Sequence, residues 1–319
     1  MLLRSPQPLI LIDGSDLKAD GSWYLLRAVV PVGGRGLPIL DMVFPDGKQY
    51  SPKAERTFLK RLKAIVPEGV TPILITDAGF RSTWFRAVEA LGWYWLGCLR
   101  NTTHVKPTAA PDHANQWIPC KALYALANAT PHDMGLMDTV RKRPWVCHVA
   151  LWSKPPKGRC AKTRRGAKPR SSRSKKNAAR EREPCIIVAS PSLALNARQM
   201  MALYTRRMQI ELSFRDLKSH QYGQGFEDSR TRKGKRIEVL LLLQSLAAFA
   251  TWLVGLACEA SGIVQRLSPR TRPKKEHYST MRVGQEALQR GWPTGMTSKC
   301  IALLRAPPEE ALVPSGEIV

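Results

Sequence analysis

LILIDG, residues 9–14, is the stretch that indicates the fold, because four apolar residues run directly into an acid and a glycine. A short apolar run of this kind is typical of a buried strand. A second run, ILITD at residues 73–77, has the same form and is followed by Ala78-Gly79. Each expected strand therefore ends on a carboxylate, Asp13 or Asp77. Such a carboxylate needs a partner, which is either a helix N-terminus that it caps or a divalent cation.

The residues around these two runs predict an alternating α/β order. The expected strands lie near 9–12, 22–31, 38–44, 72–76 and 93–99. Helices are expected at 52–66 and near 81–91, and Gly33-Gly34-Arg35-Gly36 predicts a hairpin turn. This order is that of a ribonuclease-H-like α/β fold, a mixed sheet flanked by helices. Because the first and fourth strands are neighbours in that fold, we expect Asp13 and Asp77 to lie side by side.

A third acid occurs in YTRRMQIELSFRDLK, residues 204–218, which is predicted to be a helix. Its spacing places Tyr204, Arg207, Glu211 and Lys218 within about 60° of one another on the helix surface. Glu211 could bind a metal there while Arg207 and Lys218 hold phosphates. The alternative is a solvated helix face with ordinary i,i+4 ion pairs. Asp13, Asp77 and Glu211 together make a three-carboxylate set, which favours the metal site.

The composition indicates a polyanionic partner. The chain has 50 Lys and Arg residues against 25 Asp and Glu, a formal charge of +25 and a pI of about 10.2. Such a charge favours nucleic acid through counterion release, although charge alone does not distinguish it from an anionic membrane surface. The seven cysteines form no CxxC pair and no signal peptide is evident, which predicts a reducing cytoplasm.

The predicted organisation divides the chain into four segments. Residues 1–100 form the first part of the catalytic core, and residues 101–184 form a β-rich basic insertion that is partly disordered. Within that insertion, residues 153–183 hold thirteen basic side chains against two glutamates. Residues 185–262 form the second part of the core, and residues 263–319 form a basic C-terminal region with a disordered tail.

One segment, residues 239–258, is long and apolar enough to span a bilayer. Three polar residues interrupt it, and a single such helix late in a basic chain is more simply a core helix buried on all sides. We therefore expect no membrane contact.

Five stretches resemble the DDE transposases of bacterial cut-and-paste insertion sequences, specifically insertion sequence family four with its YREK signature. They are LILIDGSDL (9–17), TPILITDAGF (71–80), ALGWYWL (90–96), YTRRMQIELSFRDLKS (204–219) and YGQGFEDSRT (222–231). The resemblance implies that Asp13, Asp77 and Glu211 are the catalytic triad and hold two Mg²⁺ or Mn²⁺ ions.

The same resemblance implies a reaction and its partners. A nick at the transposon end would free a 3′-hydroxyl, which would form a hairpin on the opposite strand and later attack target DNA. Arg207 and Lys218 would contact phosphates near the cleaved end, and Tyr204 would add a hydroxyl contact. The implied partners are transposon ends, target DNA and a second copy of the chain in a synaptic homodimer. The implied location is the bacterial cytoplasm, associated with the nucleoid.

Three features depart from the family pattern. Family members carry an end-recognition segment ahead of the first aspartate, so the chain is expected to be a truncated copy. Cys185 stands where the family has a Trp that stacks on a flipped base, and stacking contributes about 1–3 kcal/mol per base. Gly14 follows Asp13 where a bulky aromatic is usual, and we expect an effect on packing only. Two alternatives therefore stay open: a ribonuclease-H-like nuclease without end specificity, and a catalytically defective DNA-binding fragment.

Overall fold

The computed structural model describes residues 3, 5–18, 20–45, 47–48, 51–99, 103–108, 116–153, 183–220, 223–266 and 278–291. The chain divides into two compact units. The first unit comprises Met1–Ile75, Arg86–Trp93 and Arg206–Val319, and the second comprises Thr76–Phe85 and Tyr94–Thr205.

The sheet of the first unit has the order β3-β2-β1-β4, which confirms that the first and fourth strands are neighbours. Its strands are β1 (Leu9–Asp16), β2 (Trp23–Val32), β3 (Arg35–Pro45) and β4 (Ile73–Thr76). The first three are antiparallel, whereas β4 runs parallel to β1, since Thr71 N donates to Pro6 O and Ile73 N to Pro8 O. The predicted glycine hairpin is confirmed, because Gly33 and Gly34 have φ of 50° and 76°, as two-residue hairpin turns require.

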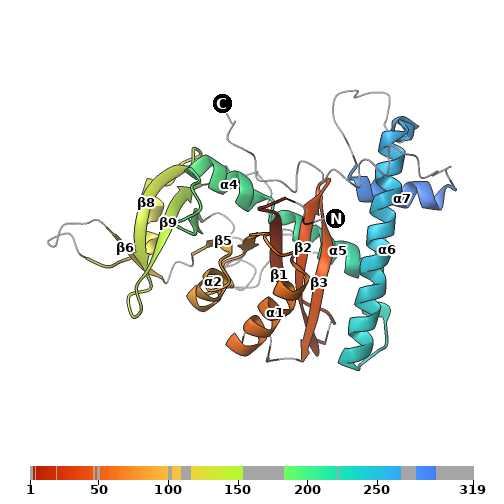
Figure 1. Cartoon of the computed structure of the whole chain (residues 1–319), viewed down its shortest axis with the longest axis horizontal. Helices are drawn as coiled ribbons and strands as arrows, with labels where there is room; N and C mark the ends of the chain where they lie inside the picture. Colours follow the sequence, from red (N-terminus) through yellow and green to blue (C-terminus); the bar gives the residue numbers. More distant parts are fainter. Residues whose placement is uncertain are drawn as a thin grey trace, which may run out of the picture. The chain divides into compact units, whose positions relative to one another are not determined.

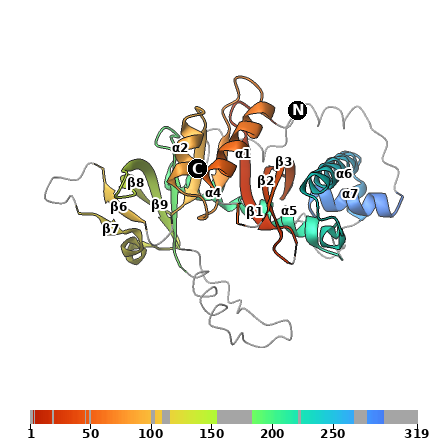
Figure 2. The ribbon, with the colours of Figure 1, turned by 90° about the horizontal axis from the view of Figure 1, so that it is seen from below.

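Helices lie on both faces of this sheet. They are α1 (Pro52–Ile65), α5 (Met208–Lys218), α6 (Gly234–Ala260) and α7 (Thr280–Gln289), with short 3₁₀ turns η3 (Phe226–Asp228) and η4 (Ile263–Arg266). α1 begins where predicted because Ser51 Oγ accepts from Ala54 N and Pro52 occupies the first helical position. α1 lies on one face of the strands and α5 on the other, whereas α6 lies along β3 (Figures 1 and 2).

The strands of the second unit lie in the order β5-β10-β9-β8-β6-β7. Its strands are β5 (Tyr94–Cys98), β6 (His104–Pro107), β7 (Ile118–Pro119), β8 (His132–Thr139), β9 (Trp145–Trp152) and β10 (Cys185–Ala189). Its helices are η2 (Cys120–Leu126) and α4 (Ala197–Thr205), and α2 (Ser82–Glu89) crosses the unit boundary. Phe85, Trp95 and Trp145 form its aromatic core, with ring centroids 4.5–5.5 Å apart.

These strands and helices confirm the predicted fold class. Ten strands in parallel and antiparallel pairings, flanked by helices, make a ribonuclease-H-like mixed sheet. The four strands between residues 104 and 152 make the predicted insertion β-rich. Most of the basic run at 153–183 and all of the predicted disordered tail lie outside the described residues.

The prediction that residues 239–258 are buried on all sides is wrong. Val239, Leu242, Leu243 and Leu246 of α6 are each between 56% and 59% exposed. α7 covers only the later part of the helix, where a Cβ on Gly255 would lie 2.0 Å from Thr280 O, so the two backbones touch. By length and composition, α6 is the one described helix that could cross a membrane, and 28% of its apolar window is buried.

A buried ion pair fixes α5 on the sheet. Arg27 of β2 lies directly opposite Asp41 of β3 and donates from Nε and Nη2 to its two carboxylate oxygens, both at 2.8 Å. The side chains are only 3% and 8% exposed. The same guanidinium lies over the Phe214 ring at 5.7 Å and reaches Ser213 Oγ at 3.5 Å, both on α5. A bidentate pair with these extra contacts satisfies a charge that burial would otherwise penalise.

Replacing Asp41 by Ala should therefore lower the free energy of unfolding by about 3–5 kcal/mol, because it leaves the Arg27 guanidinium buried without its counter-ion. Denaturant unfolding monitored by circular dichroism measures this loss. Arg61→Ala, which breaks an exposed pair with Glu238, is the control and should cost less than about 1 kcal/mol. Equal losses in the two variants would contradict this role of Arg27 and Asp41.

Candidate active site

Arg207 joins two of the predicted carboxylates in the first unit. Its Nη1 donates to Asp13 Oδ2 at 3.1 Å, and its Nη2 donates to Glu211 Oε1 at 2.6 Å. Asp13 comes from β1 and Glu211 from the first turn of α5, so the two acids are 198 positions apart in the chain (211 − 13) yet share one guanidinium. Asp13 and Arg207 are largely buried, whereas Glu211 is 44% exposed. The pairing of Glu211 with Arg207 is the i,i+4 contact expected from the spacing.

The prediction of one continuous helix over residues 204–218 is wrong. α4 ends at Thr205 and α5 begins at Met208, with a turn at Arg206-Arg207. In this turn Gln209 N donates to Arg206 O and Ile210 N to Arg207 O, which are i→i+3 bonds rather than α-helical ones. The contact of Arg207 with Asp13 is a tertiary interaction, and such interactions override local helix propensity.

Gly14 provides space beside Asp13. Its N–H donates to Asp13 Oδ1 at 2.7 Å, which holds that carboxylate in place. A Cβ at Gly14 would lie 2.0 Å from the hydroxyl oxygen of Tyr24 on β2. The Tyr24 ring therefore occupies the volume that a larger residue after Asp13 would need.

Lys218 lies further along α5 and also contacts β1. Its Nζ donates to Ser15 Oγ at 2.7 Å, so it approaches the same strand as Arg207. Burial lowers the pKa of the Lys218 ammonium, although the carboxylates of Glu227 and Asp16 oppose this effect. A half-buried cation whose hydrogen bond goes to a neutral hydroxyl is suited to receive an anionic group.

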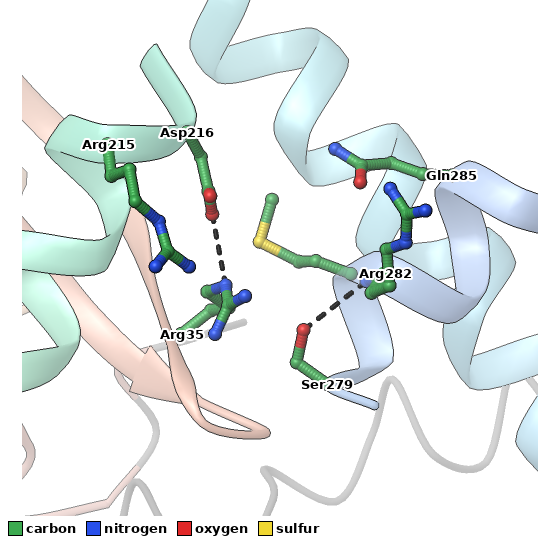
Figure 3. Close-up of a pocket in the computed structure, with 7 residues that line it drawn as sticks. Arg35, Arg215, Asp216, Ser279, Arg282 and Gln285 are labelled. Carbon is green, nitrogen blue, oxygen red and sulfur yellow. Dashed lines mark hydrogen bonds and ion pairs between the residues drawn. The ribbon is translucent and has the colours of Figure 1, made fainter. Parts of the chain in front are cut away.

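A cationic cavity lies on another side of α5 (Figure 3). Its volume is about 240 Å³, and its polar lining comes from β3, α5 and the start of α7: Arg35, Arg215, Asp216, Ser279, Arg282 and Gln285. Arg35 Nε donates to Asp216 Oδ2 at 3.0 Å. Burial raises the pKa of the Asp216 carboxyl against the opposing charges of Arg35 and Arg215. Three guanidinium groups around one carboxylate make the cavity cationic, and no periodic pattern in the sequence indicates it.

The remaining predicted residues belong to the second unit. Asp77 follows β4, and its Oδ1 accepts from Gly79 N at 2.7 Å. A Cβ at Gly79 would lie 2.7 Å from that same oxygen, so the tight turn favours glycine. Tyr204, near the end of α4, is hydrogen-bonded to the Cys98 side chain, and Cys185 begins β10. Tyr204 is thus on α4, whereas Arg207 lies in the turn before α5, and Glu211 and Lys218 lie on α5.

The carboxylates of the first unit fit a hard divalent cation. Carboxylate oxygens are the ligands that Mg²⁺ and Mn²⁺ prefer, and Arg207 shows that Asp13 and Glu211 accept a cationic group between them. Across the described residues, however, no three His, Cys, Asp or Glu side chains are gathered in a metal-binding arrangement. The group that Asp13 and Glu211 share is the Arg207 guanidinium.

Comparison with known proteins identifies the family. A protein-family model described as "Transposase DDE domain" matches residues 4–250, which is most of the chain. The chain belongs to the transposase DDE domain family.

Two other comparisons add little to this assignment. The transposase domain is similar to the cryo-EM structure of a piggyBac transposase synaptic complex with hairpin DNA, with 10% sequence identity and a TM-score of 0.41. That match covers 94% of this chain but 54% of the other, so the domain spans about half of that protein's length. A likeness at this level supports no functional argument. No curated protein matches the sequence.

The residues that support the transposase site, Arg27 and Asp41, were not predicted from the sequence. Arg27 and Asp41 fall within strands that read as apolar, and only their cross-strand register shows that they are opposite each other. The presence of a charged residue inside an apolar run could have indicated a buried ion pair, because buried charged residues are almost always paired.

Lys218→Met should leave the transposase domain no less stable than wild type at pH 7, because it removes a cation whose burial is unfavourable. The buried ammonium holds its proton less tightly than the unfolded chain does. The wild type should therefore gain stability relative to the variant as pH rises toward the ordinary lysine value of 10.5. Thermal or denaturant unfolding from about pH 7 to pH 10.5 measures the difference.

Ser15→Ala is the control for this prediction, since it removes the hydrogen-bond acceptor and keeps the cation. It should be less stable than Lys218→Met at pH 7. A loss of more than about 2 kcal/mol in Lys218→Met would instead assign Lys218 a structural role.

Proposed function

We propose that this transposase domain cleaves DNA at the ends of a mobile element and joins them to target DNA by phosphoryl transfer. The observation that carries the proposal is the shared contact of Arg207 with Asp13 and Glu211. It brings together two residues of the predicted triad and one basic residue of the YREK signature. We further infer that the chain belongs to insertion sequence family four and cuts through a hairpin intermediate.

In this proposal Asp13, Asp77 and Glu211 hold two Mg²⁺ or Mn²⁺ ions. Such ions, when bound, polarise the phosphate and favour the hydroxide or alkoxide form of the attacking oxygen. The protein's own contribution is positioning, because phosphoryl transfer needs its reacting oxygens in line and its charge neutralised. Gly14 N–H and Gly79 N–H each fix one oxygen of an aspartate, which orients the carboxylates.

The basic residues of the site would hold the DNA strand. Arg207 is the group best placed to exchange a carboxylate for a phosphate, since its fork of donors fits either anion. Lys218 would contribute a point charge beside β1, and Tyr204 a hydroxyl from the second unit. The absence of an indole at Cys185 predicts a weaker hold on a flipped base during hairpin formation.

The proposed partners are transposon ends, target DNA and a second copy of the chain. The charge of +25 supports a polyanion as partner and implies binding that weakens steeply with salt. We place the protein in the bacterial cytoplasm, associated with the nucleoid and without membrane contact.

A cleavage assay tests this function. The purified chain is incubated with Mg²⁺ or Mn²⁺ and a labelled duplex that carries the element's terminal repeat, and products are resolved on a denaturing gel. A hairpin product supports the proposal. Nicking that ignores the terminal repeat would instead indicate a ribonuclease-H-like nuclease, and a mobility shift without cleavage a DNA-binding fragment.

Glu211→Gln should reduce cleavage roughly 1,000-fold or more, because the amide has lost the negative charge that the site requires. Binding of the duplex, followed by fluorescence anisotropy at low salt, should change by less than about threefold, because phosphate contacts come from basic side chains. Glu238→Gln, an exposed change on α6, is the matched control and should cleave normally. Loss of binding in Glu211→Gln would make Glu211 a structural residue.

A further inference from the structure

Two cysteines of the second unit face each other on neighbouring strands. Cys98 is the last residue of β5 and Cys185 the first residue of β10, and the antiparallel register pairs Cys98 with Ile187. Cys185 therefore lies on the same face as Cys98, one diagonal step away. The two Sγ atoms are 3.3 Å apart.

This pair differs from the other described thiols in its surroundings. Cys120 and Cys147 are fully buried, and burial raises the pKa of the Cys120 thiol to about 11. Cys98 and Cys185 are both partly exposed. The hydrogen bond with Cys185 lowers the pKa of the Cys98 thiol, burial opposes it, and a hydrogen bond with Tyr204 lowers it further. A partly exposed thiol whose pKa is lowered reacts with oxidants more readily than a buried one.

We propose that Cys98 and Cys185 form a modification site at which a peroxide converts two thiols into a disulfide. The Cys98 sulfur attacks one peroxide oxygen, the O–O bond breaks, and hydroxide leaves to give a sulfenic acid. The Cys185 sulfur then attacks the Cys98 sulfur, the S–O bond breaks and water leaves as the S–S bond forms. Each hydrogen peroxide consumed thus yields two waters, with two thiols oxidised.

The geometry of the two strands permits this bond. The sulfurs need to approach from 3.3 Å to about 2.05 Å, a movement of about 1.3 Å at the two strand ends. Each cysteine is a terminal residue of its own strand, where the backbone has fewer ladder neighbours to shift than in a strand interior. A thiol pair of this kind in a reducing compartment is typically a transient redox site rather than a structural crosslink.

The modification site lies beside two residues of the proposed active site. Tyr204 is hydrogen-bonded to Cys98, and the Asp77 carboxylate is close enough to act on the Cys98 thiol electrostatically. All four residues belong to the second unit. Oxidation would therefore change the surroundings of the signature tyrosine.

The full chain is treated with hydrogen peroxide, alkylated and analysed by mass spectrometry without reduction. The expected results are two fewer alkylated thiols per chain than in untreated protein and one linked peptide pair that contains Cys98 and Cys185. Dithiothreitol should reverse both changes. This readout does not depend on DNA cleavage, so it distinguishes failure of this proposal from failure of the proposed function.

Cys98→Ser and Cys185→Ser should each abolish the link, whereas Cys120→Ser, the matched control in the same unit, should retain it. Two outcomes would overturn the proposal. One is a link that involves Cys160 or Cys300, which lie outside the described residues. The other is wild-type protein whose Cys98 and Cys185 are alkylated as fully after peroxide as before it.

Discussion

The buried contact between Arg27 and Asp41 is the constraint on which the site in the first unit depends. It ties β2 to β3, and through Phe214 and Ser213 it holds α5 against the sheet. Glu211 lies near the start of that helix and reaches the Arg207 guanidinium that Asp13 of β1 shares. If α5 were not held against the sheet, Glu211 would not be held near Asp13. A buried charge is thus used here to position a helix rather than to add net stability.

Electrostatics explains why the site holds an arginine. Two carboxylates that approach one another repel, and a shared cation removes most of that cost. Arg207 supplies such a cation to Asp13 and Glu211. The family's chemistry places divalent ions among such carboxylates, and an arginine released by them would be available to bind phosphate.

The second unit contains different chemistry. Asp77 lies in a tight turn in which Gly79 donates to its carboxylate. Tyr204, near the end of α4, is hydrogen-bonded to Cys98, one of a pair of thiols. Cys185, at the start of β10, faces Cys98 at the end of β5. The two sulfur atoms are 3.3 Å apart.

Much of this architecture follows from local sequence. Three signals act over only a few residues and made the strands, the hairpin and the first helix predictable. They are the apolar runs that end in Asp13 and Asp77, the glycine pair at 33–34 and the Ser51-Pro52 cap. Other features depend on partners that are distant in the chain. They are the turn at Arg206-Arg207, the exposed face of α6, the Arg27–Asp41 pair and the Cys98–Cys185 contact. Only the tertiary structure decides these features, because strand register and packing bring together residues that are far apart in the sequence. No local pattern in the sequence indicates which of them will meet.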